Sequence, residues 1–241
     1  MMSKIETGYA DYSDGKTTFE AFVAHTGGTE KRPAVLVAHQ WAGQIDHERS
    51  RAEQLAEAGY VGIAIDTYGK GVRGTPGQDN GALIAPLMAD RALLRDRLMA
   101  AVAFAKAHPL VDPSRIAIIG FCFGGLCALD VARTGTTEVV GAVSFHGIYP
   151  QPNLGPQAPI HTKVQVHHGW EDPLAPPQDV LALAKELTDA GAQWQLNAYG
   201  DTVHAFTAKG MNNREGGAQY NEIADRRSWQ ATLLFFEEIF A

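Results

Sequence analysis

Short apolar segments alternate with helical segments along most of this chain, and no other feature constrains its fold as strongly. The apolar segments predict buried strands, and they cover residues 33–39, 60–66, 115–121, 139–147 and 163–169. Apolar strands separated by helices are typical of a parallel sheet that is covered on both sides. The sequence therefore predicts an α/β fold with a mostly parallel central sheet and helices on both of its faces.

The helical segments and two further strands complete this pattern. A helix is predicted over residues 46–59, where Gly59 ends it. The other predicted helices begin at Gly124 or cover residues 89–109, 177–191 and 226–240. Residues 17–25 predict an early strand at the edge of the sheet, and residues 194–200 predict the last strand. Because the 241 residues contain no repeat or linker, we expect one domain spanning residues 1–241.

Composition excludes several classes of protein. The formal net charge of −7 argues against a nucleic-acid partner, because phosphate binding needs a clustered basic surface. No apolar segment approaches the roughly 20 residues that cross a bilayer, and the N-terminal residues lack the apolar region of a secretory signal. We expect a cytoplasmic monomer or homodimer. The two cysteines, Cys122 and Cys127, have neither the spacing of a redox pair nor that of half a zinc site.

Residues 120–124 (GFCFG) place a cysteine between glycines where a predicted strand ends. G-x-C-x-G at a strand-to-helix junction is the nucleophile-elbow pattern with sulfur in place of the serine hydroxyl. The glycines leave space for a sharp, strained turn that exposes the side chain at the rim of the sheet. The helix N-terminus favours a thiolate there, and the N–H of Phe123 points at the same spot. This pattern favours Cys122 as a nucleophile over Cys122 as a packed side chain.

A thiol nucleophile needs a base, and the base needs an orienting acid. Hydrolases with this elbow carry the acid and then the histidine further along the chain. Asp172 follows the strand over residues 163–169 and precedes a proline, and His204 follows the last predicted strand. Both positions lie at carboxyl ends of strands, where parallel sheets bind ligands. Glu171 and Asp201 are rival acids, although Asp201 is also suited to forming a turn.

With these residues the chain resembles the dienelactone hydrolase family, a cysteine-using branch of the α/β-hydrolases. The similar segments are AHQWAG (38–43), IDTYG (65–69), GFCFGG (120–125), HHGWEDP (167–173) and YGDTVHAF (199–206). The resemblance implies a triad of Cys122, Asp172 and His204. It also implies an oxyanion hole formed by the N–H groups of Phe123 and Trp41. The implied activity is hydrolysis of small carboxylic esters or lactones through a thioester, and we expect no cofactor and no metal.

Two positions depart from the dienelactone-cleaving members of this family. Gln40 stands where they carry a glutamate that holds the resting thiol, and an amide cannot accept the thiol proton at neutral pH. We therefore hypothesise that Cys122 rests as a thiolate paired with protonated His204. Its alkylation rate should then vary little between about pH 5 and 9, without the rise near pH 8.5 of a free thiol.

The second departure concerns the substrate. Ala208, with Lys209 beside it, stands where those members carry an arginine that holds the substrate carboxylate. Without this bidentate clamp, we expect uncharged esters or lactones to be the preferred substrates. Arg73 and Arg91 are other cations that could reach the pocket, but exposed surface positions are expected for both.

Residues that follow the predicted strands form the expected substrate pocket. These candidates are Gln40, Trp41, Tyr68, His146, Tyr149, Trp170 and Phe206. The aromatic members would either form an apolar cup for the acyl or alcohol group or pack the rim of the sheet. The loop over residues 149–161 is too short for the helical lid of a lipase, so no lid domain is expected.

Three other functions fit parts of the sequence. A non-catalytic relative that binds a ligand would have no chemical reason to keep a complete triad. A peptidase or an acyl transferase could use the same acyl-enzyme, but peptidases of this fold usually add a gating domain. A metal enzyme would need histidine ligands, and no pair of the candidates has the i,i+4 spacing of a zinc protease helix. Those candidates are His39, His146, His167 and His168.

Overall fold

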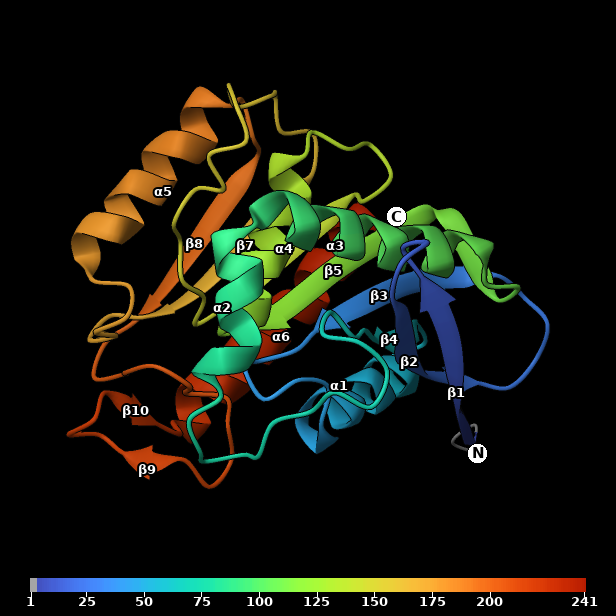
Figure 1. The fold of residues 1–241 in the computed structure, drawn as a ribbon, viewed down its shortest axis with the longest axis horizontal. Helices are drawn as coiled ribbons and strands as arrows, with labels where there is room; N and C mark the ends of the chain where they lie inside the picture. The colour runs from blue at the N-terminus through green and yellow to red at the C-terminus, as the bar shows by residue number, and fades with distance from the viewer. Residues whose placement is uncertain (1–3) are drawn as a thin grey trace.

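The computed structural model describes residues 4–241, and its centre is one eight-stranded sheet (Figure 1). The strands are β1 (Ile5–Ser13), β2 (Thr18–Thr26), β3 (Arg32–Ala38), β4 (Val61–Ala64), β5 (Val111–Phe121), β6 (Gly141–Phe145), β7 (Lys163–Gly169) and β8 (Trp194–Tyr199). Their order across the sheet is β1-β2-β4-β3-β5-β6-β7-β8. The β1–β2 and β2–β4 pairs are antiparallel, and the other neighbours are parallel. The predicted α/β fold is confirmed.

Helices cover both faces of this sheet (Figure 1). They are α1 (Asp46–Glu57), α2 (Gly81–Ala89), α3 (Arg91–Ala107), α4 (Phe123–Arg133), α5 (Pro177–Asp189) and α6 (Glu222–Ile239). On one face, Val37 of β3 shares a core with Leu55 of α1 and Phe236 of α6. On the other face, its neighbour Leu36 shares a core with Leu94 of α3. Consecutive residues of a strand point to opposite faces, so two buried faces explain the continuous apolar segments.

The N-terminal edge of the sheet differs from the prediction. Residues 17–25 were expected at the edge, but β2 lies inside the sheet between β1 and β4. The true edge strand, β1, pairs with β2 from Ile5↔Thr26 to Ser13↔Thr18. Most residues of β1 are exposed, so this strand lacks the apolar pattern that marks the buried strands.

Three further elements have no strong sequence signal. Helix α2 contains Pro86 and lacks a side-chain N-cap. Strands β9 (Asn212–Asn213) and β10 (Ala218–Gln219) form a two-stranded hairpin, and they are too short to show a period.

Two predicted helices begin earlier than expected. Helix α4 begins at Phe123 instead of Gly124, because Cys122 itself occupies the N-cap. Helix α6 begins earlier than predicted, because the side chain of Asn221 accepts hydrogen bonds from the first helical N–H groups.

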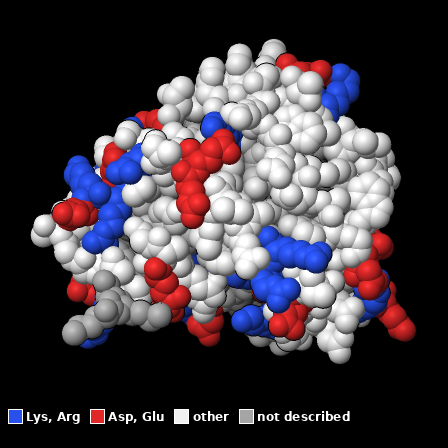
Figure 2. Space-filling model, turned by 180° about the vertical axis from the view of Figure 1, so that it is seen from behind, with Lys and Arg blue, Asp and Glu red and all other residues white. Residues whose placement is uncertain are grey.

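Three further observations concern the helices, the loop after β6 and the surface. Among the described residues, no helix combines the length and apolarity that a membrane span requires. Residues 146–162, between β6 and β7, contain no helix or strand, so no lid domain arises there. On the face drawn in Figure 2, basic and acidic side chains lie in small mixed groups beside a wide uncharged area. This face shows no extended basic surface among the residues that the structure describes (Figure 2).

Candidate active site

Cys122 occupies a strained turn between β5 and α4. Its φ of 55° and ψ of −115° lie in a region that few L-residues adopt. A Cβ atom on Gly120 would lie 1.9 Å from the carbonyl oxygen of Gly124, and one on Gly124 would lie 2.1 Å from that of Ala38. Only glycine therefore fits at both positions. The turn leaves the Cys122 side chain partly exposed at the N-terminus of α4.

His204 and Asp172 form a hydrogen bond beyond the carboxyl ends of β7 and β8. His204 Nδ1 donates to Asp172 Oδ2 over 2.7 Å, and both residues are buried. The other carboxylate oxygen of Asp172 accepts a hydrogen bond from the N–H of Leu174 over 2.8 Å. The turn after β7 therefore fixes the carboxylate, and the carboxylate fixes the ring.

The β9–β10 hairpin holds the backbone of His204. The N–H of His204 donates to the carbonyl of Gly217 over 3.0 Å, and its carbonyl accepts from the N–H of Gln219 over 3.0 Å. A Cβ atom on Gly217 would lie 2.3 Å from the ring of Pro173, so the hairpin also packs against the turn that carries Asp172. The hairpin, which links the acid to the base, was not predicted because its two-residue strands show no sequence period.

The other ring nitrogen of His204, Nε2, is buried and has no hydrogen-bond partner within residues 4–241. Burial lowers the pKa of His204, but the negative charge of Cys122, the hydrogen bond to Asp172 and the contact with Cys122 together raise it to about 10. The structure therefore brings the three predicted triad residues together. Their order is that of a nucleophile, a base and an orienting acid.

The rival acids take part in other interactions. Glu171 accepts a hydrogen bond from the N–H of Thr202 over 2.6 Å. The exposed Asp201 pairs with Arg214 over 2.6 Å. Asp172 is the carboxylate that contacts His204.

The histidines considered as metal ligands contact different partners. The ring of His39 contacts the carbonyl of Gln40 and the hydroxyl of Thr67, that of His167 contacts the hydroxyl of Tyr199, and that of His168 contacts the hydroxyl of Tyr149. His146 lies against the elbow of Cys122. Across residues 4–241, no group of three or more histidine, cysteine or acidic side chains is arranged to hold a metal ion.

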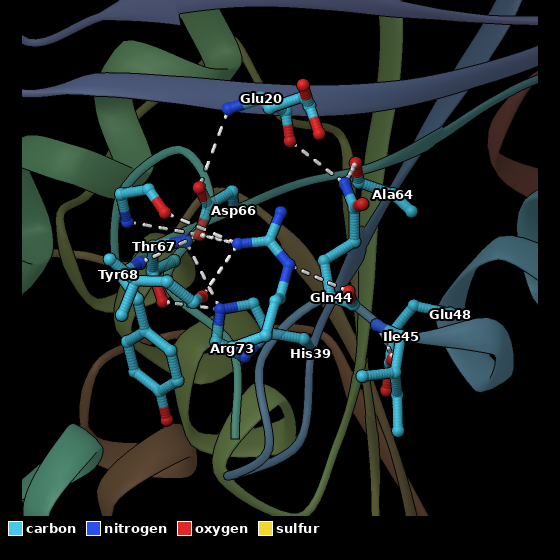
Figure 3. Close-up of polar contacts among 12 residues, drawn as sticks. Glu20, His39, Gln44, Ile45, Glu48, Ala64, Asp66, Thr67, Tyr68 and Arg73 are labelled. Atoms are coloured by element: carbon cyan, nitrogen blue, oxygen red, sulfur yellow. Dashed lines mark hydrogen bonds and ion pairs between the residues drawn. The ribbon is translucent and has the colours of Figure 1, made fainter. Parts of the chain in front are cut away.

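Buried polar contacts hold the loop over residues 39–45, which carries Trp41 (Figure 3). Gln44 Nε2 donates to the carbonyl of Ala64 over 2.7 Å. Arg73 Nε donates to the carbonyl of Gln44 over 2.9 Å. The Tyr68 hydroxyl donates to the carbonyl of Trp41 over 3.0 Å. These contacts come from strand β4 and the loop after it, and Gln44 Nε2 also donates to the carbonyl of Glu20 in β2 over 2.9 Å.

The two predicted oxyanion donors remain available. Within residues 4–241, the N–H groups of Phe123 and Trp41 donate no hydrogen bond to a backbone carbonyl. Phe123 N–H belongs to the first residue of α4, where helical N–H groups have no partner inside the helix.

The predicted pocket residues separate into two groups. Gln40 and Trp41 line a groove of about 700 Å³ together with Thr207 and Lys209. The remaining five candidates do not line this groove. Trp170 is 44 % exposed, whereas the other four are buried. The buried candidates are Tyr68, His146, Tyr149 and Phe206.

The expectation of an exposed position is wrong for Arg91, and Arg73 is only partly exposed. Arg73 lies 3.4 Å from the buried carboxylate of Asp66. Arg91 is buried, and its guanidinium donates to Asp130 over 2.9 and 2.6 Å. A buried arginine needs such a partner, and these partners keep both guanidinium groups in the scaffold. Lys209, in contrast, is exposed.

Comparison with known proteins identifies this combination of fold and site. The model of the dienelactone hydrolase family matches residues 19–240. The chain belongs to the dienelactone hydrolase family. It is a hydrolase.

Relatives in the dienelactone hydrolase family match the whole chain. A Bradyrhizobium sp protein named "Probable 2-oxo-3-(5-oxofuran-2-ylidene)propanoate lactonase" is 28 % identical over a 245-residue alignment that covers 95 % of this chain and 94 % of that protein. The solved structure "m3DLH" is 33 % identical, has a TM-score of 0.88, and covers 98 % of this chain and 99 % of its own. A dienelactone hydrolase-like promiscuous phosphotriesterase from metagenomic libraries is 32 % identical, with a TM-score of 0.87 and 98 % of each chain covered.

In this member of the dienelactone hydrolase family, a buried carboxyl group lies beside Gln40. Glu48 of α1 is 0 % exposed. Its Oε1 accepts from the N–H of Gln40 over 3.3 Å, and its Oε2 accepts from the N–H of Ile45 over 3.0 Å. Glu48 thus binds both ends of the segment that carries Trp41. This role of Glu48 was not predicted, although a glutamate three positions after the residue preceding a helix is a known N-terminal signal.

Glu48 is expected to make stability depend on pH in a way that Glu48→Gln removes. Burial raises the pKa of Glu48 from 4.5 to about 7 and outweighs the lowering by its hydrogen bonds. As the pH rises from about 4.5 to about 7, the unfolded chain releases this proton before the folded protein does, so stability is lost over that interval. Across this pH interval, the free energy of unfolding of wild type should therefore fall by on the order of 3 kcal/mol relative to that of the variant.

Urea unfolding at about pH 5 and about pH 7.5 measures this difference. Other carboxyl groups titrate alike in both proteins. The difference between wild type and variant in how the free energy of unfolding changes with pH therefore gives the contribution of Glu48. Parallel curves for wild type and Glu48→Gln would contradict the prediction.

Proposed function

We propose that this hydrolase cleaves small, uncharged carboxylic esters or lactones through a thioester on Cys122. The observation that carries the proposal is the hydrogen bond from His204 to Asp172, which leaves the buried Nε2 of His204 without a partner among the described residues and free to act on the nearby Cys122 thiol. A relative named as a lactonase supports the choice of ester and lactone substrates. We place the whole reaction in one domain that spans the chain.

In the first step, the sulfur of Cys122 attacks the substrate carbonyl. The N–H groups of Phe123 and Trp41 bind the negative oxygen of the tetrahedral intermediate, each worth about 10²–10³ in rate. As the carbon–oxygen bond of the ester breaks, protonated His204 gives its proton to the leaving alkoxide. The products of this half-reaction are an alcohol and a thioester.

In the second step, a water molecule attacks the thioester carbon. His204, now neutral, takes a proton from the water while Asp172 holds its Nδ1–H. The carbon–sulfur bond breaks, the carboxylic acid leaves, and Cys122 and protonated His204 are restored. The same two N–H groups bind the second oxyanion.

A burst of p-nitrophenol from p-nitrophenyl acetate tests the proposed function. A thioester that forms faster than it hydrolyses gives a burst with an amplitude near one per protein molecule. A chelator should leave the burst unchanged. Absence of both a burst and steady turnover would favour the non-catalytic reading, and loss of activity with the chelator would favour a metal enzyme.

Neutral esters should be better substrates than esters that carry a carboxylate. Arg73 and Arg91 are bound within the scaffold, and Lys209 is a single exposed cation at the groove. We expect kcat/KM for a neutral short-chain ester to exceed that for a matched half-ester of a dicarboxylic acid by about tenfold, since no bidentate clamp offsets desolvation of the carboxylate. Lys209→Ala should change this ratio by no more than about threefold. A marked preference for the half-ester would contradict the prediction.

A further inference from the structure

His146 is buried between the nucleophile elbow and the loop of the catalytic histidine. It follows β6, is 0 % exposed, and has a φ of 37°, which is unusual for a residue with a side chain. Its N–H donates to the carbonyl of His167 over 2.8 Å. A position this strained persists only when its surroundings hold it.

The contacts of the His146 ring determine which nitrogen carries the proton. The N–H of Cys122, which also donates to the carbonyl of Phe145 over 3.1 Å, lies 3.2 Å from His146 Nδ1. A backbone N–H only donates, so Nδ1 must be the acceptor and the proton must lie on Nε2. His146 Nε2 then donates to the hydroxyl oxygen of Thr207 over 2.8 Å.

The surroundings of His146 keep its ring neutral. Burial, followed by the charges of His204, His47 and Arg51, lowers the pKa of His146 well below its usual value. A protonated ring would lose the acceptor at Nδ1 and would place a charge beside His204. The ring centroids of His146 and His204 are 5.1 Å apart, with an angle of 72° between the planes.

We propose that His146 is a positioning residue that links the Cys122 elbow to the loop carrying His204 through the hydroxyl of Thr207. Thr207 follows His204 by three positions and is buried. The bridge therefore helps to set the separation between the sulfur of Cys122 and the imidazole of His204. The inference rests on the proposed function, because it gives His146 and Thr207 the role of positioning the proposed triad.

Thr207→Val tests the bridge with little change in volume. It removes the acceptor and leaves the buried Nε2–H of His146 unpaired. We expect kcat for p-nitrophenyl acetate to fall about tenfold, with KM changed less than about twofold, because small misplacements of reacting groups are costly. The pH profile of Cys122 alkylation by iodoacetamide should also shift toward that of a free thiol. Thr207→Ser keeps the hydroxyl and should preserve both properties.

Thr162→Val is the matched control. The Thr162 hydroxyl donates to the carbonyl of Val139 over 2.9 Å, and the residue is buried, but it lies at the start of β7, away from the triad. This variant should retain kcat and the alkylation profile. His146→Phe keeps an aromatic ring but no nitrogen, and combining it with Thr207→Val should cost no more than either change alone.

Two results would overturn the bridge. The first is a Thr207→Val protein that matches Thr162→Val in kcat and alkylation, and the second is equal loss in Thr207→Val and Thr207→Ser. Failure of the proposed function is distinguishable. If wild type cleaves no ester, the alkylation profiles of wild type and Thr207→Val still decide whether the bridge positions the imidazole against the sulfur.

Discussion

Replacing Cys122 with alanine is expected to abolish the p-nitrophenol burst and to lower ester turnover by about 10⁴-fold or more, the scale seen when a nucleophile is removed from a triad. Alanine cannot form the thioester, so only substrate binding and the two backbone donors of the oxyanion hole remain. Cys122→Ser should also retain little activity, since a hydroxyl is far harder to deprotonate than a thiol. Burst amplitude and steady-state turnover measure both effects.

The chain offers a matched control on the same helix. Cys127 is buried and belongs to the core on one face of the sheet, so Cys127→Ala should keep the burst and near wild-type turnover. It also removes the second thiol, which leaves Cys122 as the single alkylation site. Near-full turnover in Cys122→Ser would show that sulfur is incidental, and a burst in Cys122→Ala would rule out Cys122 as the nucleophile.

Asp172→Asn is expected to lower kcat by about 10²–10⁴-fold with a smaller effect on KM, as when the orienting acid of a triad is changed to its amide. Asp172 Oδ2 accepts from His204 Nδ1 over 2.7 Å, which keeps Nε2 available to exchange a proton with sulfur. An asparagine amide can turn its NH₂ group toward Nδ1. The ring then carries its proton on Nε2 and cannot act as a base.

Asp201→Asn and Glu171→Gln separate this role from general loss of charge. Both side chains are bound away from His204, so each variant should stay within about threefold of wild-type kcat. Thermal unfolding of all three variants shows whether the loss in Asp172→Asn follows from stability. Equal losses in the three variants would remove Asp172 from the role of orienting acid.

Much of the fold and of the candidate triad could be predicted because the signals are local. Strand β4 and residues 116–121 of β5 are buried on both faces and therefore appear as unbroken apolar segments. Gly120, Cys122 and Gly124 are close in sequence because a single sharp turn requires all three. The order of the strands along the chain then brings residues after β7 and β8 to the edge where β5 ends.

Partners that lack a periodic pattern could not be predicted. In the sequence, Arg91 has the features of a surface cation on an amphipathic helix. It is buried because Asp130, on another helix, accepts its hydrogen bond. Glu48 resembles any polar residue in the first turn of a helix, but the fold closes the Trp41 loop over its carboxyl group. Whether a charged side chain can be buried depends on its partners in the folded protein. These partners lie far away in the sequence, so no regular spacing predicts them.

The amino-acid sequence by itself determined the layered α/β architecture, the elbow at Cys122 and the order of acid and base, because each follows from hydrophobic period, turn geometry or position after a strand. Only the tertiary structure decided that β1 forms the edge, that the β9–β10 hairpin binds the backbone of His204, and that His146 contacts Thr207. These contacts join residues far apart in the chain, and a single hydrogen bond between distant side chains depends on packing that no local pattern encodes.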